Sequence, residues 1–71
     1  MTLENRITNR RKEMGLTQEE FALKAGISQP YLSQLEKGAF DPTAPVIVRL
    51  AMALTMSADE LLGINDVKKA G

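Results

Sequence analysis

The 71-residue sequence contains no cysteine and no histidine. Without cysteine the chain can form neither a disulfide framework nor a thiolate nucleophile. Without histidine it lacks the commonest metal ligand and the side chain that transfers protons near neutral pH. Asp41, Asp59 and Glu60 are typical of turns and helix caps rather than of a catalytic site. We therefore expect no enzyme activity, no cofactor, no metal and no small-molecule substrate.

The sequence also lacks long apolar runs and net charge. No hydrophobic segment approaches the roughly 18 residues that a membrane span requires, and the N-terminus carries no secretory signal pattern, so we expect a cytoplasmic protein. Nine basic residues balance nine acidic ones, which removes the positive field typical of nucleic-acid-binding proteins. One local basic patch remains, formed by Arg10, Arg11 and Lys12 near Arg6.

Apolar residues recur at helical intervals along the chain, and no strand-like alternation competes with them. The first stripe comprises Leu3, Ile7, Arg11 and Met14, the second Phe21, Ala22 and Ala25, the third Leu32 and Leu35, the fourth Ile47, Leu50, Ala51 and Leu54, and the fifth Leu61 and Leu62. The pattern predicts an all-α fold, a compact five-helix bundle. We expect one domain over residues 1–63 and a C-terminal tail over residues 64–71.

Start and stop signals separate these helices. Thr17 with Glu20, and Ser57 with Glu60, have the spacing of capping boxes. Gly15, Gly26, Gly38 and Gly63 follow the predicted helices, where a left-handed residue is favoured. Ser28 or Gln29 would cap the third helix, and Thr43 would cap the fourth. Residues 17–38 are therefore predicted to form two short helices joined by a tight turn.

Two short helices joined in this way form a helix-turn-helix, whose second helix can enter the DNA major groove. The stretch GLTQEEFALKAGISQPYLSQLEKG resembles the signature of the phage-repressor and Cro-type helix-turn-helix family, whose fold is lambda-repressor-like. TAPVIVRLAMALTMSADELLG is similar to the fourth and fifth helices of that family. The resemblance covers residues 3–63 and implies binding to double-stranded operator DNA, usually as a homodimer.

The resemblance also implies roles for single residues. Gln18 matches a glutamine that holds a phosphate and supports a reading residue, and Gln29 and Gln34 match positions that touch base edges. A glutamine amide can pair bidentately with adenine. Tyr31 and Ser33 lie on the same outward side. Lys37 and Gly38 match the point where backbone amides approach a phosphate. The implied DNA-binding set is Gln18, Gln29, Tyr31, Ser33, Gln34, Lys37 and Gly38.

Arg11 and Glu36 each fall on the inward face of their helix, where a lone charge is costly to bury. We expect them to form a structural ion pair, as the matching Arg and Glu do in the family. The alternative is that Arg11 extends to the surface and binds a phosphate.

The sequence departs from the family pattern in three ways. Pro30 stands where a small or polar residue is usual, and it could make Gln29 the helix cap instead of a reading residue. Thr55 replaces the glycine that usually follows the fourth helix. Leu23, Val46 and Met52 are apolar where the family tends to be polar.

Two functions follow from these observations. The first is a sequence-specific transcriptional regulator, a repressor, that reads an inverted-repeat operator through its third helix. The alternative is a protein-interaction module on the same fold, such as an antitoxin subunit or a coactivator-like adaptor. Zero net charge and the three unexpected apolar residues favour the alternative.

Overall fold

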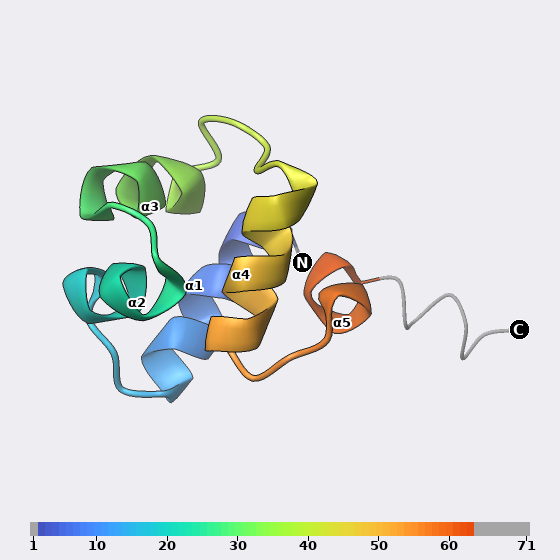
Figure 1. Cartoon of the computed structure of the whole chain (residues 1–71), viewed down its shortest axis with the longest axis horizontal. Coiled ribbons are helices and arrows are strands. Elements are labelled where there is room, and N and C mark those ends of the chain that lie inside the picture. The colour runs from blue at the N-terminus through green and yellow to red at the C-terminus, as the bar shows by residue number, and fades with distance from the viewer. Residues whose placement is uncertain (1, 64–71) are drawn as a thin grey trace, which may run out of the picture.

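The computed structural model describes residues 2–63, and these fold into five α-helices with no strand among them. The helices are α1 (Leu3–Glu13), α2 (Gln18–Ala25), α3 (Gln29–Glu36), α4 (Ala44–Ala53) and α5 (Ala58–Leu62) (Figure 1). The predicted all-α, five-helix architecture is confirmed. The predicted tail, residues 64–71, lies outside the described residues.

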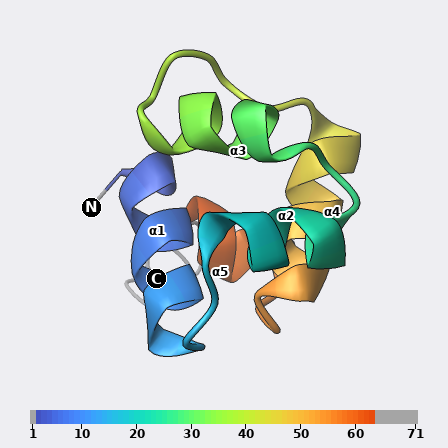
Figure 2. The same ribbon diagram turned by 90° about the vertical axis from the view of Figure 1, so that its left-hand side faces the viewer.

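The core lies where the apolar stripes of the five helices meet. Its largest fully buried side chains are Ile7, Phe21, Leu32, Leu35, Leu50, Leu54 and Leu61. α2 packs on both α3 and α4, while α5 packs on α1 and α4. Figure 2 shows α3 along the top of the molecule with α2 below it. This arrangement leaves the side of α3 that points away from α2 uncovered by any other helix.

Both predicted capping boxes are present. The Thr17 hydroxyl accepts from the Glu20 amide at 3.1 Å, and the Glu20 carboxylate accepts from the Thr17 amide at 2.9 Å. Ser57 and Glu60 form the same reciprocal pair at the start of α5. These bonds satisfy amides that have no partner within the helix. They also lower the pKa of Glu20, through its hydrogen bonds with the Thr17 backbone and then with the Thr17 side chain.

The turn after α4 ends in a threonine with positive φ. Thr55 has φ 58°, the left-handed conformation that costs a residue with a Cβ about 1–2 kcal/mol. The Met56 amide donates to the Ala51 carbonyl at 2.9 Å across this turn. The α4 end therefore takes the same shape as a glycine-capped helix, at a conformational cost that glycine would avoid.

Three details of the predicted helices differ in the structure. Leu62 is 39% exposed, so Leu61 alone fills the core from α5. Val46, one of the three unexpected apolar residues, is half-buried and packs against the buried cluster. Thr43 occupies the N-cap position of α4, but its side chain makes no capping hydrogen bond.

None of the helices within residues 2–63 combines the length and the hydropathy needed to span a bilayer.

Candidate nucleic-acid interface

The turn between α2 and α3 begins at Gly26, which ends α2 in the left-handed conformation with φ 74°. An L residue with a side chain rarely adopts this conformation, whereas glycine does so freely. The Ile27 amide then donates to the Ala22 carbonyl at 3.0 Å, closing the last turn of α2. The Ile27 side chain packs against the core and fixes the angle between the two helices.

Ser28, not Gln29, caps α3, the helix that the sequence predicts to enter the DNA groove and that is called the recognition helix below. The Ser28 hydroxyl accepts from the Tyr31 amide at 3.2 Å, and Gln29 is the first helical residue. Pro30 is second, where its missing N–H removes no intrahelical bond. The possibility that Pro30 turns Gln29 into the cap is therefore wrong, because Ser28 already accepts the capping bond. The Gln29 side chain is exposed.

The seven predicted DNA-binding residues lie at the start of α2, along α3 and just after it. Gln29, Gln34, Lys37 and Gly38 are exposed, whereas Gln18, Tyr31 and Ser33 are half-buried. The buried residues of α3 are Leu32 and Leu35. Gln29 and Gln34 are therefore open to solvent on α3, while two leucines hold its inner side to the core.

A buried ion pair joins α1 to the end of α3, as predicted. Arg11 Nε donates to Glu36 Oε2 at 2.8 Å, and Arg11 Nη2 donates to Glu36 Oε1 at 3.1 Å. The two side chains are 9% and 6% exposed. Arg11 Nη1 also donates to the Leu16 carbonyl at 2.8 Å. Arg11 is thus committed to the interior, and the alternative that it reaches a phosphate is wrong.

Gln18 joins this ion pair from the first turn of α2. Its Nε2 donates to Glu36 Oε1 at 3.1 Å. One carboxylate therefore connects α1, α2 and α3, which fixes the recognition helix against both helices beneath it. Nε2 carries two hydrogens, so one N–H of Gln18 and its amide oxygen stay outside this bond.

The environment of Glu36 favours its charged form. Burial raises the pKa of this carboxyl, but hydrogen bonds from Arg11 and Gln18, the attraction of the Arg11 guanidinium and a hydrogen bond from Thr8 together outweigh it. The net effect is a pKa below the ordinary value of 4.5. Glu36 is therefore ionised at neutral pH, and its charge is matched inside the protein.

The basic patch predicted around Arg10 and Arg11 is dispersed in the structure. Arg11 is buried in the ion pair, and Arg10 Nε donates to the Leu54 carbonyl at the end of α4, at 3.0 Å. The Arg6 guanidinium lies so close to Gly63 that a Cβ there would be 2.6 Å from Nη2. Among these four cations Lys12 alone is exposed. Arg10 and Arg11 thus bond to groups on other segments, and the Arg10 side chain remains 38% exposed, so the four cations do not form one patch.

The backbone amides after α3 are bonded within the helix end. The Gly38 amide donates to the Leu35 carbonyl at 3.0 Å and the Ala39 amide to the Gln34 carbonyl at 3.1 Å. Gly38 has φ 76°, and a Cβ there would lie 3.0 Å from Glu4 Oε1. Lys37 is exposed. The charged group available at this end of α3 is therefore the Lys37 ammonium.

Phe40, which no sequence pattern singled out, contacts the recognition helix from the following loop. Its ring lies 4.9 Å from that of Tyr31, centroid to centroid, with the planes tilted by 48°. Residues 39–43 have no helical period, so apolar spacing could not indicate where this ring would pack. The sequence offered one signal that could have drawn attention to Phe40. It is an aromatic residue within AFDPTAP, a seven-residue loop rich in turn-forming residues.

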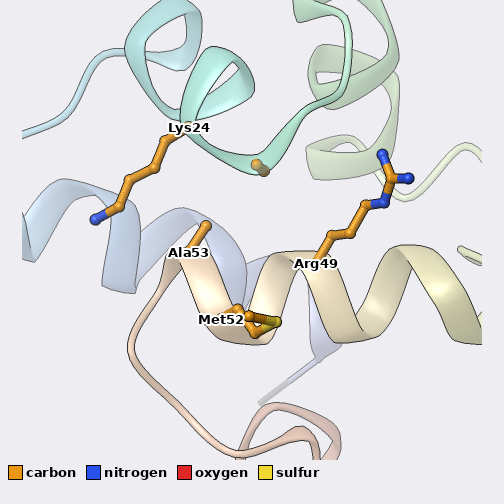
Figure 3. A pocket seen from close by; sticks show the side chains of 5 residues that line it. Lys24, Arg49, Met52 and Ala53 are labelled. Atoms are coloured by element: carbon orange, nitrogen blue, oxygen red, sulfur yellow. The ribbon is translucent and has the colours of Figure 1, made fainter.

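The two most exposed large apolar residues lie on α2 and α4. Leu23 on α2 is 83% exposed and Met52 on α4 is 75% exposed. Met52 borders a shallow hollow of about 270 Å³ between α2 and α4, which Lys24 and Arg49 flank (Figure 3). The lining is completed by Ala25 and Ala53 and includes no carboxylate.

Comparison with known proteins connects this geometry to a family. The helix-turn-helix family model matches residues 7–61. An uncharacterized HTH-type transcriptional regulator of Sinorhizobium fredii is 48% identical over 56 residues, covering 79% of this chain and 73% of the relative. The cryptic phage CTXphi transcriptional repressor RstR of Vibrio cholerae is 38% identical over 63 residues, covering 89% of this chain and 56% of RstR. Two mycobacterial regulators are covered over 39% of their length.

Solved structures agree with the sequence matches. The P22 c2 repressor, in complex with a synthetic operator, is 31% identical with a TM-score of 0.82 over 87% of this chain and 94% of that one. The biofilm regulator SinR, in complex with DNA, is 31% identical with a TM-score of 0.80 over 84% of this chain and 97% of that one. The chain therefore belongs to the helix-turn-helix family of the phage-repressor and Cro type.

Proposed function

We propose that this protein is a transcriptional repressor that binds a specific DNA sequence by inserting α3 into the major groove. The observation that carries the proposal is the placement of Gln34, exposed on the uncovered side of a helix whose other side is held by Leu32, Leu35 and the Glu36 ion pair. A rigid helix with outward amides is suited to direct readout of bases. The P22 c2 repressor and SinR, both solved with DNA, support this use of the fold.

The exposed residues of α3 divide into reading and positioning groups. Gln34 and Gln29 can each pair with N6 and N7 of an adenine, and Ser33 can reach a base edge or a phosphate. Lys37 supplies a positive charge for a phosphate, and the second N–H of Gln18 can donate to another. Gln18 would then hold DNA and Glu36 at the same time. A phosphate contact there would be coupled directly to the position of α3.

A homodimer on an inverted repeat follows from the weak electrostatics of one chain. The full chain has no net charge, and α3 itself contains no basic residue. One copy can therefore neutralise few phosphates, and phosphate contacts supply much of the affinity for DNA. A second copy doubles the contacts, and its site would lie about one helical turn away. Such a regulator would work in the cytoplasm, where its operator is found.

Selection of binding sites from a random duplex pool tests these points together. We expect the purified chain to enrich an inverted repeat of adenine-containing half-sites, with centres about 10 base pairs apart. Sedimentation of the chain with the enriched duplex should give two copies per site. Enrichment of no sequence, with binding that depends on salt alone, would contradict the proposal.

A protein-interaction module is the second candidate, because Leu23 and Met52 are the most exposed large apolar residues of the described chain. Exposed apolar residues on two neighbouring helices can bind a protein partner. A titration with mixed genomic DNA at low salt separates the two functions. A repressor binds in a salt-sensitive way, whereas an interaction module shows no binding, with or without Gln34→Ala.

A further inference from the structure

The loop between α3 and α4 brings an aromatic ring to the recognition helix. Figure 2 shows the loop running back along α3 on the side away from α2. Phe40 in this loop is 38% exposed and makes a ring contact with Tyr31 at 4.9 Å. Tyr31 is half-buried and packs against the buried cluster, whereas Phe40 is exposed. The contact with Tyr31 therefore leaves part of the Phe40 ring open to solvent.

Helix geometry places this aromatic pair beside a proposed reading residue. Tyr31 and Gln34 are three residues apart on α3, so their side chains are neighbours on the helix surface. Phe40 contacts the Tyr31 ring from the loop that follows α3. The strip formed by these three side chains therefore links the Gln34 amide to two rings through Tyr31.

The chemistry of this strip matches one base in the major groove. Thymine alone presents an apolar group there, its 5-methyl, and apolar side chains recognise it by contact. Phe40 carries neither a positive charge nor a hydrogen-bond donor on its side chain, so a phosphate contact does not explain its exposure. An amide that binds adenine, placed next to rings that can hold a methyl group, suits adjacent A·T pairs.

We propose that Phe40 and Tyr31 form a thymine-methyl site next to the base read by Gln34, so that a loop residue contributes to sequence specificity. This inference rests on the proposed function, since it requires α3 to lie in the major groove. It assigns to Phe40 a role outside the helix-turn-helix itself. Tyr31 contributes its ring, not its hydroxyl.

Uracil substitution tests the proposal, because it removes the methyl group and nothing else. Thymines of one half-site in the selected duplex are replaced singly, and the dissociation constant is measured by fluorescence anisotropy for the full chain. We expect one replacement to weaken binding roughly fourfold, the effect of one methyl leaving an apolar contact. Phe40→Ala should bind the thymine duplex roughly fourfold more weakly and lose its sensitivity to that replacement.

Two further variants keep the test specific. Tyr31→Phe retains the ring and should keep the uracil penalty, whereas loss of the penalty would overturn the proposal by assigning the effect to the hydroxyl. Leu23→Ala, an exposed apolar change on α2, should behave as the unchanged protein. Melting temperatures verify that each variant is folded.

The proposal is overturned if no uracil weakens binding, or if Phe40→Ala keeps the full penalty at the same position. A uniform weakening of Phe40→Ala on all duplexes would likewise overturn it, because the residue would then only hold the loop. If the unchanged protein selects no duplex at all, the result contradicts the proposed function itself. That outcome is distinct from a failure of the thymine-methyl site.

Discussion

The two sides of α3 differ in how their polar groups are satisfied. On the inner side, the Glu36 carboxylate is bonded to Arg11 and Gln18 and is almost fully removed from solvent. On the outer side, Gln29, Gln34 and Lys37 are exposed. A folded chain keeps buried polar groups bonded, so polar side chains left in solvent are those that remain free to bind a ligand. The contrast separates the residues that fix α3 to the rest of the protein from the residues that are free to contact DNA.

Removing one partner of the inner ion pair is expected to give the largest effect. Arg11→Met leaves the Glu36 charge buried and unpaired, which should lower the free energy of unfolding by about 3–5 kcal/mol. The double variant Arg11→Met/Glu36→Leu buries no charge and should recover much of that loss. Urea denaturation followed by circular dichroism measures both. Equal destabilisation by the single and double variants would show that the pair does not act as a unit.

Acid should also destabilise the protein through the inner ion pair, but by less than the Arg11→Met substitution. The folded-state pKa of Glu36 lies below its ordinary value of 4.5, so the stability it contributes is present above that value and is lost as the pH falls through the lower, folded pKa. Urea denaturation at pH 7 and pH 3 should show a larger loss for the unchanged protein than for Glu36→Gln.

Glu20 needs its own control, since its pKa is also lowered. Glu20→Gln preserves the capping-box geometry without the charge. The Glu20→Gln variant should keep the loss of stability in acid that Glu36 causes. Equal acid sensitivity of the Glu36→Gln variant and the unchanged protein would remove Glu36 from the explanation.

Changes on the outer side should alter DNA binding and leave stability intact. Gln34→Ala should change the free energy of unfolding by less than about 0.5 kcal/mol. It should also reduce discrimination at one base pair by about 1–3 kcal/mol. Lys37→Ala is the matched control, expected to weaken binding to all sequences and to reduce the salt dependence by about one phosphate contact. Anisotropy titrations with the selected and mutated duplexes distinguish the two patterns, and a uniform loss for Gln34→Ala would argue against base reading.

The smallest expected effect concerns the capping of α3 at its N-terminus. Ser28→Ala removes a capping hydrogen bond of 3.2 Å and should cost about 1 kcal/mol. Thr43→Ala, at the N-cap of α4, should cost less, because the Thr43 side chain makes no capping bond. Thermal denaturation of the two variants gives the comparison. A larger loss for Thr43→Ala would contradict this view of the caps.

Local patterns were sufficient to predict the five helices and most of their ends. A capping box such as Thr17 with Glu20 requires two side chains three residues apart, and the turn at Gly26 requires a residue without a Cβ. Both depend on neighbours in the chain, so the sequence contains all the information needed. The inward positions of Arg11 and Glu36 predicted two buried charges that pair, and the family resemblance implied the same pair.

Contacts between distant segments were decided only by tertiary packing. The sequence grouped Arg6, Arg10, Arg11 and Lys12 as one basic patch, but the helices direct Arg10 to the end of α4 and Arg11 to Glu36. Phe40 could not be placed because a loop has no period, and its ring position depends on where the chain returns along α3. The half-burial of Val46 and the exposure of Leu62 were decided in the same way, by the helices that pack against α4 and α5. Sequence spacing determines which face of a helix a residue occupies, whereas the neighbouring helices determine what that face meets.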